Sequence, residues 1–564
     1  MKRILLFLFA IVFVSTINSQ TQLQWAKTVG GTGTEQVSRV ERNNFGTFIV
    51  GSFEGTVDFN PGAGVNSLTS NGLKDGFLLK LDDSGNFQWA IQIGWTLNDQ
   101  INDVKLDNSG NIYLIGNFRG TVDFNPSPSV ASTTTSNGGD DIFILKLNIN
   151  GNYVLHKRIG GPGNEKGNAI TLDPFVIPYI TGSFEQTVDF NPDAGVTNLT
   201  VDGNRDGFVM KLNPSSLGLI FVKQLKGILT PPSIPSSYAE GTSIIVDGDQ
   251  NIFVGGLYRG LVDFNAPGNS VTKISGASSN AYNAFLAKYD SSGDISFVIG
   301  NDSDANSEVK DLAFDSSGNI ISVGSLQGMG NFNPQGTFNL TAIGGVNSFV
   351  WKLSSTAQFS WAKVFTGNVN EAHSLVVDSN NDIYVGGYFA LAVNFGGVNQ
   401  NAGAGNDDGY FVKYLSNGNL SYALKISGSQ NRIKDIFISG SDVFVVGEFQ
   451  LDADLDMEPP TAFNVNSNGL WDVYVEKITE SSLGIDDNIV SKFKLYPNPT
   501  KNTLNIQTVS SFKFDILSLD GKLIQSGTSK INETAIDVSK LVSGMYVLEI
   551  TSEEKKSVQK FIKN

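Results

Sequence analysis

The sequence predicts an all-β fold: a seven-bladed β-propeller closed by an N-terminal outer strand, followed by a small C-terminal β-sandwich. A unit recurs seven times before residue 480, each copy holds four short strand-like runs, and long helical periodicity is absent from the copies. The first landmark is Val57-Asp58-Phe59-Asn60. Its second position recurs at 58, 123, 189, 263, 331, 394 and 454. Such a long period, built from short strands and turns, favours a propeller over a single irregular core.

Two further landmarks define the strands of each copy. A β-rich run ends in glycine in all seven copies, and an aromatic residue follows two positions later in all but one of them, where Leu326 stands instead. A second run ends in lysine in every copy, at positions 80, 146, 211, 288, 352, 413 and 477. Because all copies share this lysine, we expect a repeated structural contact and not a catalytic amine.

The second copy illustrates the four predicted strands, at 101–106, 111–118, 141–147 and 153–159. Short polar turns rich in Gly, Asn and Asp join the first strand to the second and the third to the fourth, as tight hairpins require. The chain enters on Leu23 to Lys27, which matches the fourth strand of other copies, whereas the last copy ends on its third strand. We therefore expect the N-terminal strand to pair with Asp472 to Ile478 and complete the seventh blade, leaving no long open edge.

The N-terminus is predicted to be a secretory signal peptide over residues 1–19, with a basic start and an apolar run over Ile4 to Val14. A retained membrane anchor is the alternative, although this apolar run is short for a span. The net charge of −16 argues against binding to nucleic acids and anionic membranes. There are no cysteines, which excludes disulfides and thiol nucleophiles.

Composition changes again after the seventh copy. Domain boundaries are predicted at 20–479 for the propeller, 480–492 for a polar and acidic linker, and 493–564 for the terminal sandwich. Six strand-like runs follow the linker, and Asp520-Gly521 is a typical hairpin turn between two of them. This size and pattern favour a small antiparallel sandwich.

Two parts of the chain resemble known families. Runs such as Asp141 to Leu147 and Gly160 to Glu165 are similar to the bacterial β-propeller repeat family known as SBBP, over about residues 23–479. The terminal segment resembles the type A C-terminal sorting domain of the type IX secretion system. The positions that carry this resemblance are Tyr496, Pro497, Asn498, Pro499, Gly521, Gly544 and Tyr546.

The second resemblance implies Bacteroidetes-type export across the outer membrane by the type IX secretion machinery. It also implies removal of the terminal domain and either release of the protein or its attachment to surface lipopolysaccharide. The mature protein is then expected outside the cell or on the outer-membrane surface, reached through the periplasm. A propeller hosts binding modules, scaffolds and enzymes alike, so the repeat resemblance predicts a fold and leaves the activity open.

Acidic residues that precede the first strands are the candidate site. They are Glu35, Asp99, Glu165, Glu240, Glu308 and Glu371, with Asn431 in the seventh copy. If the first strands line the axis, these side chains stand together around the mouth of the channel. Two interpretations remain open, repeated capping of turn amides and oxygen-ligated calcium. The Val-Asp-Phe-Asn loops offer the same choice between Asx-type turns and calcium.

Other chemistry is scarce in the sequence. The two histidines, His156 and His373, occupy unrelated positions of the repeat, so neither a catalytic triad nor a zinc site is expected. Trp95 lies in a loop on the same face as the acids and either packs or stacks on a sugar. The fourth copy departs longest from the repeat, over Leu225 to Glu240.

The sequence therefore predicts a secreted or surface-attached interaction module without catalytic residues or a certain cofactor. Its expected ligand is a glycan, a polysaccharide or a protein. Two alternatives belong to other classes. One is a secreted hydrolase or lyase that acts on polysaccharide with carboxylates of this face. The other is a structural adhesion component without a small ligand.

Overall fold

The computed structural model describes residues 20–127, 129–229, 237–275, 281–403, 406–458, 461–481, 494–508, 512–518, 522–529, 532–552 and 555–564. The predicted signal peptide and nearly all of the predicted linker lie outside these ranges. The chain divides into a compact unit of residues 18–480 and a second that holds residues 481–564. All elements in the described ranges are β-strands, so none is a helix with the length and hydropathy to cross a membrane.

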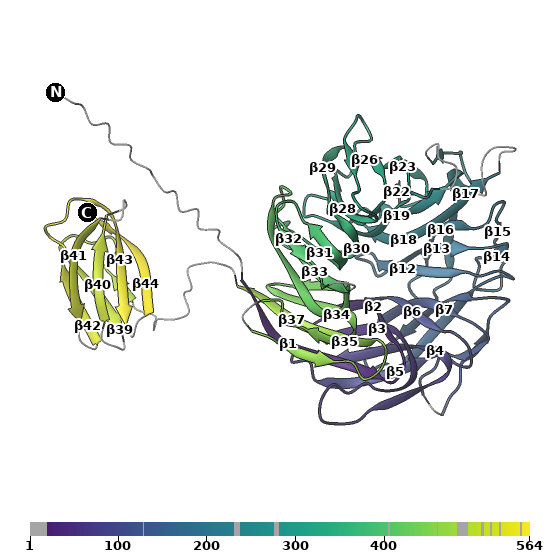
Figure 1. Cartoon of the computed structure of the whole chain (residues 1–564), viewed down its shortest axis with the longest axis horizontal. Helices are drawn as coiled ribbons and strands as arrows, with labels where there is room; N and C mark the ends of the chain where they lie inside the picture. The colour runs from purple at the N-terminus through teal and green to yellow at the C-terminus, as the bar shows by residue number, and fades with distance from the viewer. Residues whose placement is uncertain are drawn as a thin grey trace. The chain divides into compact units, whose positions relative to one another are not determined.

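Each sequence copy folds into an antiparallel sheet of four principal strands (Figure 1). The first strands are β2 (Glu35–Asn43), β6 (Gln100–Leu106), β12 (Lys166–Leu172), β18 (Tyr238–Val246), β24 (Ser307–Phe314), β30 (Thr366–Val377) and the later part of β34 (Leu420–Ser439). The second strands are β3 (Gly46–Asp58), β7 (Ile112–Phe118), β13 (Pro178–Phe184), β19 (Ile252–Arg259), β25 (Ile320–Leu326), β31 (Ile383–Asn394) and β35 (Asp442–Asp454).

The outer half of each sheet follows the same order. The third strands are β4 (Ser67–Leu81), β10 (Asp141–Leu147), β16 (Asp206–Leu212), β22 (Asn283–Tyr289), β28 (Asn347–Leu353), β33 (Asp407–Tyr414) and β37 (Asp472–Ser481). The fourth strands are β5 (Phe87–Ile93), β11 (Tyr153–Ile159), β17 (Leu219–Ile228), β23 (Ile295–Gly300), β29 (Phe359–Val364), the start of β34, and β1 (Gln20–Gly31). The third and fourth strands predicted for the second copy match β10 and β11, and β37 continues two residues past the predicted boundary at 479.

Short additional ladders flank the Val-Asp-Phe-Asn motif, which the sequence alone presents as a loop. They are β8 (Thr121–Asp123) with β9 (Thr133–Thr135), β14 (Thr187–Asp189) with β15 (Asn198–Thr200), β20 (Leu261–Ala266) with β21 (Thr272–Ile274), and β26 (Met329–Asn331) with β27 (Asn339–Thr341), while β32 (Asn399–Asn401) and β36 (Asn464–Asn466) pair with β31 and β35. In the first copy, Asp58 Oδ1 accepts the Asn60 and Asn66 backbone N–H groups at 3.0 and 2.8 Å. The predicted Asx-type turn is therefore present.

The repeated lysine makes the structural contact that the sequence predicts. In five copies its ammonium lies near a carbonyl in the third-to-fourth turn of the next copy, as Lys211 Nζ does at 3.4 Å from Ser291 O and Lys352 Nζ at 3.3 Å from Ser416 O. In the last two copies Lys413 and Lys477 pair with carboxylates instead. The Lys211 cation also sits 5.2 Å above the ring of Tyr179, which adds a cation–π attraction. In the first five copies the lysine thus joins neighbouring sheets.

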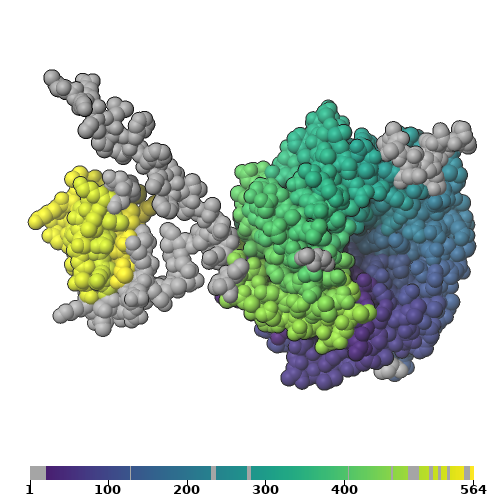
Figure 2. All heavy atoms as spheres, in the orientation of Figure 1, coloured from purple at the N-terminus to yellow at the C-terminus, as the bar shows by residue number. Residues whose placement is uncertain are grey.

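The copies follow one another in a complete circuit. Each first strand contacts the next, from β2 through β6, β12, β18, β24 and β30 to β34, and β34 contacts β2. The N-terminal strand β1 is hydrogen-bonded to β37, as the strand order predicts, and Trp25 Nε1 donates to Asp83 O of the first copy at 3.1 Å. Figure 2 shows the purple residues of the first copy beside the yellow-green residues of the last copy. The hydrophobic core lies between adjacent sheets, where Ile115 of the second copy packs in one cluster with Ile180 of the third.

The terminal unit contains two antiparallel sheets, as the sequence predicts. One sheet has β38 (Lys494–Tyr496), β39 (Thr503–Thr508) and β42 (Asn532–Asp537), and the other has β40 (Phe512–Leu517), β41 (Leu523–Ser529), β43 (Gly544–Ser552) and β44 (Lys555–Lys563). Leu504 and Ile536 of the first sheet share a buried cluster with Ile516, Leu548 and Phe561 of the second. Alternate residues of each strand therefore meet in a single core.

Candidate functional site

The seven first strands share a bulge that determines which side chains face the centre of the circuit. In β6 the pairing register shifts between Ile101 and Asp103, and the same shift occurs at the equivalent place in every other first strand. A bulge places two residues opposite one on the partner strand. As a result, two successive residues, such as Asn102 and Asp103, line the central cavities together.

Three levels of side chains follow from this register. The rim position holds Gln36, Gln100, Lys166, Glu240, Glu308, Glu371 and Arg432. The second tier, two residues later, holds Ser38, Asn102, Asn168, Thr242, Lys310, His373 and Lys434. The floor position, one residue further, holds Arg39, Asp103, Ala169, Ser243, Asp311, Ser374 and Asp435.

The rim and the second tier enclose a polar cavity of about 520 Å³, here called the polar cup. All seven second-tier residues line it, together with the rim residues Gln36, Gln100, Glu240 and Glu308 and with Tyr238. Its size lies within the range of roughly 300–1,000 Å³ that is typical of small-ligand sites. Copies one to three contribute mainly amides and a hydroxyl, whereas copies four to seven contribute most of the charges.

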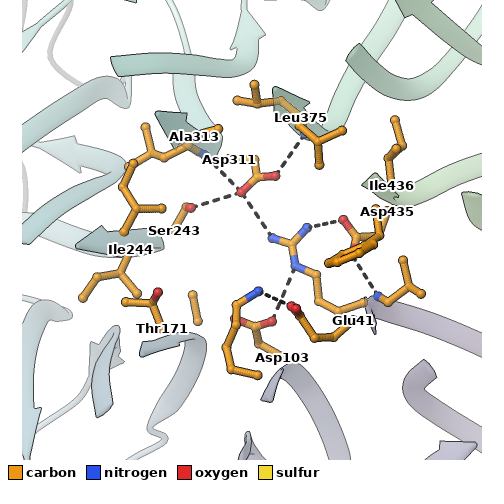
Figure 3. Close-up of a pocket in the computed structure, with 18 of the residues that line it drawn as sticks. Glu41, Asp103, Thr171, Ser243, Ile244, Asp311, Ala313, Leu375, Asp435 and Ile436 are labelled. Atoms are coloured by element: carbon orange, nitrogen blue, oxygen red, sulfur yellow. Dashed lines mark hydrogen bonds and ion pairs between the residues drawn. The ribbon is translucent and has the colours of Figure 1, made fainter. Parts of the chain in front are cut away.

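An ion-pair network forms the floor below the polar cup (Figure 3). The Arg39 guanidinium lies 3.2 Å from Asp435 Oδ1, 3.8 Å from Asp311 Oδ1 and 4.0 Å from Asp103 Oδ1. Because these carboxylates come from the seventh, fifth and second copies, the Arg39 side chain extends across the axis. Beside it, Lys105 Nζ pairs with Glu41 at 2.7 Å. The network separates the polar cup from a lower cavity of about 370 Å³.

The floor carboxylates also join adjacent copies through backbone groups. Asp103 Oδ2 accepts the Ile170 N–H at 2.8 Å, and Asp311 Oδ2 accepts the Leu375 N–H at 3.0 Å. Asp435 Oδ2 accepts the Val40 N–H at 2.8 Å, which connects the last copy to the first. Each of these aspartates thus holds the first strand of the copy that follows it, and fixes the geometry around the cavities.

Three of the six predicted site acids, Glu35, Asp99 and Glu165, are buried and cap loop amides. Glu35 Oε2 accepts the Gly31 N–H at 2.8 Å, and Glu165 Oε2 accepts the Gly161 N–H at the same distance. Asp99 accepts from the backbones of Trp95 and Arg119 at 2.8 and 3.1 Å. Burial raises the pKa of Glu35 to about 8 and the pKa values of Asp99 and Glu165 to about 7.

The other three predicted acids, Glu240, Glu308 and Glu371, stand at the rim position. Glu308 pairs with Lys310 at 2.8 Å, and Glu371 Oε1 accepts the Tyr388 hydroxyl at 3.1 Å. Glu240 accepts from Asn168 Nδ2 at 2.9 Å and from the Tyr238 hydroxyl. Although burial of Glu240 opposes its ionisation, Lys166, Tyr238 and Asn168 together hold its pKa below the usual value.

The expectation that all six acids form one ring at the channel mouth is wrong. Glu35 pairs with Phe53 and lies at the buried position before the rim, where the later copies have Ala239, Ser307 and Asn370. Asn431 of the seventh copy also lies at this buried position and accepts the Gly409 N–H at 2.5 Å. The acids of copies four to six come one residue later in the strand. Since strand side chains alternate between faces, this single shift moves them to the opposite face.

Calcium binding by these acids stays a prediction. Within the described ranges, no group of three or more His, Asp or Glu side chains is arranged to hold a metal ion. The nearest calcium-loop sequence, Asp452 to Asp456, contains the same turn as the other copies, with Asp454 Oδ1 accepting the Asp456 and Phe463 N–H groups at 3.1 and 2.7 Å. Turn capping accounts for the contacts seen at Asp454.

The two histidines have different environments. His156 is satisfied at both ring nitrogens, by the Thr134 hydroxyl at 2.7 Å and the Tyr153 hydroxyl at 3.0 Å, and it stacks on Phe124. His373 lines the polar cup, which sequence reasoning missed. An alignment of the seven first strands could have placed His373 in the site, because the second-tier position that it occupies is polar in every copy.

Trp95 is half exposed, with 49% of its surface accessible, and does not line the polar cup. Its backbone N–H donates to Asp99 Oδ2. The fourth copy differs from the repeat over Leu225 to Glu240. The start of this segment forms the end of β17, and its last residues begin β18. Residues 230–236 lie outside the described residues.

The predicted sorting residues lie in the terminal unit. Asn498 Oδ1 accepts the Ile562 N–H at 2.8 Å, which attaches the Tyr496-Pro497-Asn498-Pro499 segment to β44. Tyr546 stacks on Phe561 with ring centres 5.7 Å apart, and Gly544 begins β43. Gly521 lies outside the described residues.

The fold and the site define a class: an all-β repeat protein with a polar central cup and a separate terminal sandwich. Residues 494–564 match the family described as the secretion system C-terminal sorting domain. This match implies type IX export, interaction with that secretion machinery, and delivery to the cell surface or the extracellular space. An uncharacterized WD repeat-containing protein of Acanthamoeba polyphaga mimivirus is 24% identical over 446 residues, which cover 67% of this chain. The match spans 32% of that relative's length, and it suggests a propeller-like repeat region.

Proposed function

We propose that residues 20–480 form a closed seven-bladed propeller that serves outside the cell as an interaction module. The circuit of first strands and the pairing of β1 with β37 support the closure and the number of blades. The SBBP-like repeat pattern accords with this architecture. The terminal domain directs the export and is then removed, leaving the propeller released or attached to surface lipopolysaccharide.

The proposed binding site is the polar cup. The observation that carries this proposal is the gathering of all seven second-tier side chains around one cavity of about 520 Å³ that the Arg39 network closes from below. Uniform copies would present the same residue seven times. Here the tier contains Ser, Asn, Thr, Lys and His, so the repeat has diverged at the residues that a ligand would contact and has kept its packing residues.

A steric block tests the site. Gln100 is an exposed rim residue whose side chain makes no hydrogen bond with the described residues, so Gln100→Trp covers the polar cup at little structural cost. Val154, 44% exposed on the outer strand β11, provides the matched control Val154→Trp. We expect glycan-array or protein-partner binding by the exported protein to be lost in the first variant and kept in the second. Equal binding by both would move the site away from the polar cup, and no binding by the wild type would favour a structural adhesion role.

A second function, cleavage of polysaccharide, is favoured by one observation. Glu308 and Glu371 both line a further cleft of about 250 Å³ beside the polar cup, together with Tyr282 and Ser325. Two carboxyl groups in one cleft are the minimum that glycoside hydrolysis requires. Release of reducing ends from a polysaccharide panel tests this function, and the activity would have to disappear in both Glu308→Gln and Glu371→Gln.

A further inference from the structure

Four second-tier side chains of the polar cup, in copies two, three, four and six, use their hydrogen-bond donors on the protein itself. Asn102 Nδ2 donates to Gly167 O at 2.8 Å, and Asn168 Nδ2 donates to Gly241 O at 2.9 Å. In the fourth copy, the Thr242 hydroxyl donates to Val309 O at 2.6 Å. In each case the acceptor is the carbonyl that precedes the second tier in the next copy. These side chains therefore act as straps between adjacent first strands.

His373 is the strap of the sixth copy, and this role determines its tautomer. His373 Nδ1 lies 2.9 Å from Ile433 O, the equivalent carbonyl of the seventh copy. Because a carbonyl oxygen can only accept, Nδ1 carries the proton and Nε2 keeps a free lone pair. Burial, with Lys434 nearby, lowers the pKa of His373 well below its ordinary value, so the imidazole is neutral at physiological pH.

With their donors occupied, Asn102, Asn168 and His373 present acceptor atoms to the polar cup. Among the described residues, no donor reaches Asn102 Oδ1, Asn168 Oδ1 or His373 Nε2, and all three residues line the cavity. A ligand that satisfies them must supply several hydrogen-bond donors. Hydroxyl groups and ammonium groups both meet this condition.

The charged residues around the polar cup indicate which of these two ligand groups, hydroxyl or ammonium, is favoured. Lys310 pairs with Glu308 at 2.8 Å, and Lys434 pairs with Glu448 at 3.1 Å. Glu240 lies 3.7 Å from Lys166, so the opposite charges around the cup are largely matched. A cationic or a polyanionic ligand would have to break these pairs or be desolvated without a counter-ion, which costs free energy. An uncharged ligand with many hydroxyl groups avoids this cost.

We propose that the polar cup binds the end of an uncharged saccharide chain, whose hydroxyl groups donate to His373 Nε2, Asn102 Oδ1 and Asn168 Oδ1. Only a chain end fits, because the Arg39 network closes the floor and prevents a chain from passing through. This inference rests on the proposed function and adds the class of ligand and the atoms that recognise it.

The test uses the two histidines of the chain, of which His156 is an internal control. The full exported protein, labelled with ¹⁵N-histidine, is titrated with uncharged linear oligosaccharides of glucose, mannose and xylose. A cyclic glucan serves as a ligand without ends, and oligouronates serve as charged ligands. We expect one of the linear uncharged sugars to shift the His373 Nε2 resonance and to leave His156 unchanged. The cyclic glucan and the oligouronates should shift neither.

The repeat itself supplies matched variants. His373→Asn reproduces the strap and acceptor of the second and third copies, so its affinity should stay within about threefold of the wild type. His373→Lys reproduces the residue of the fifth and seventh copies and removes the acceptor, so affinity should fall about tenfold, as the loss of one hydrogen bond predicts. Tryptophan fluorescence melting confirms that each variant is folded.

Several outcomes would overturn the inference. They are tighter binding of oligouronates, equal binding of the cyclic glucan, a bound sugar that leaves the His373 resonance in place, or no binding of any uncharged sugar. If a protein or a charged glycan still binds and Gln100→Trp blocks it, the proposed function stands while the saccharide inference fails.

Discussion

Replacing the buried Glu35 by Gln should change the pH dependence of stability in a predictable way. Glu35 lies at the junction of the first and last copies, where its Oε2 accepts the Gly31 N–H. Its Oε1 and the Asp472 Oδ1 are buried and have no hydrogen-bond partner among the described residues. Burial raises the pKa of Glu35 to about 8, and Asp472 adds to the shift.

The direction of the effect follows from proton linkage. In the folded protein Glu35 titrates near pH 8, but in the unfolded chain it titrates near its ordinary value of 4.5. Between these two pH values the folded state binds more protons, so the free energy of unfolding falls as pH rises. The difference of about 3.5 pH units corresponds to a loss of at most about 5 kcal/mol by pH 9. A neutral Gln, which keeps the acceptor for Gly31 N–H, avoids this loss.

Thermal melting followed by tryptophan fluorescence measures the effect in the intact protein. All six tryptophans lie between residues 25 and 471, so the terminal sandwich does not contribute to the signal. An unfolding entropy of about 2 cal/mol/K per residue gives about 1 kcal/mol/K for this unit. Glu35→Gln should therefore melt at the wild-type temperature at pH 5 and up to about 5 °C higher at pH 9.

Identical melting curves for the two proteins at pH 9 would refute the reasoning, because they would mean that Glu35 is ionised without cost in the folded state. A lower melting temperature of the variant at pH 5 would show that the carboxyl group is needed for packing. Gln36→Glu, a change at the neighbouring rim position, is the control for a general effect of charge near this junction.

Four other predictions concern the floor, the closure, export and calcium. Arg39→Met removes the guanidinium that pairs with Asp103, Asp311 and Asp435 and should destabilise the protein by roughly 3–5 kcal/mol, seen as a lower melting temperature; an unchanged value would mean that the floor aspartates are neutral. Deleting residues 21–30 exposes the edge of β37 and should strongly destabilise the protein and cause aggregation on size-exclusion chromatography, whereas a monodisperse product would argue against closure by β1. Ending the chain after residue 490 should leave folded protein in the periplasm, and normal surface delivery in cell fractionation would contradict the sorting role. If the first-strand acids bind calcium, calorimetry should show a heat that is lost when Glu35, Glu165 and Glu308 become Gln, and an unchanged titration would mean that they only cap turns.

Most of the strand order could be predicted from the sequence because the repeat provides seven examples of each strand. The glycine and lysine landmarks fix which residues share a face, and the matching of Leu23 to Lys27 with a fourth strand gave the pairing of β1 with β37. The ladders beside the Val-Asp-Phe-Asn motif could not be predicted in the same way. They are only three residues long in most copies, and Asp58 and its counterparts indicate a turn more strongly than a strand.

The candidate site was harder to predict because its residues differ between copies. The acids were assigned to one position from their distance to the first strand, and a difference of one residue between Glu35 and Glu240 reversed their faces. The floor depends on a contact between Arg39 of the first copy and Asp311 of the fifth, which no pattern within a copy reveals. His373 was set aside because histidines were sought as a cluster, whereas its role depends on a carbonyl of the next copy.

The closure of the circuit has a consequence for the order of folding. Thr21 contacts Glu458, and Val40 contacts Asp435, at separations of 437 and 395 residues along the chain. Bringing such distant residues together requires the entropy of a very long loop to be lost before the contacts stabilise it, which makes this step slow. The sheets of single copies are local and can form early, but the junction of first and last copies can form only when nearly the whole repeat region is available. Until then the edge of β37 is open to pairing with other chains, so this junction determines how long the protein needs protection during export.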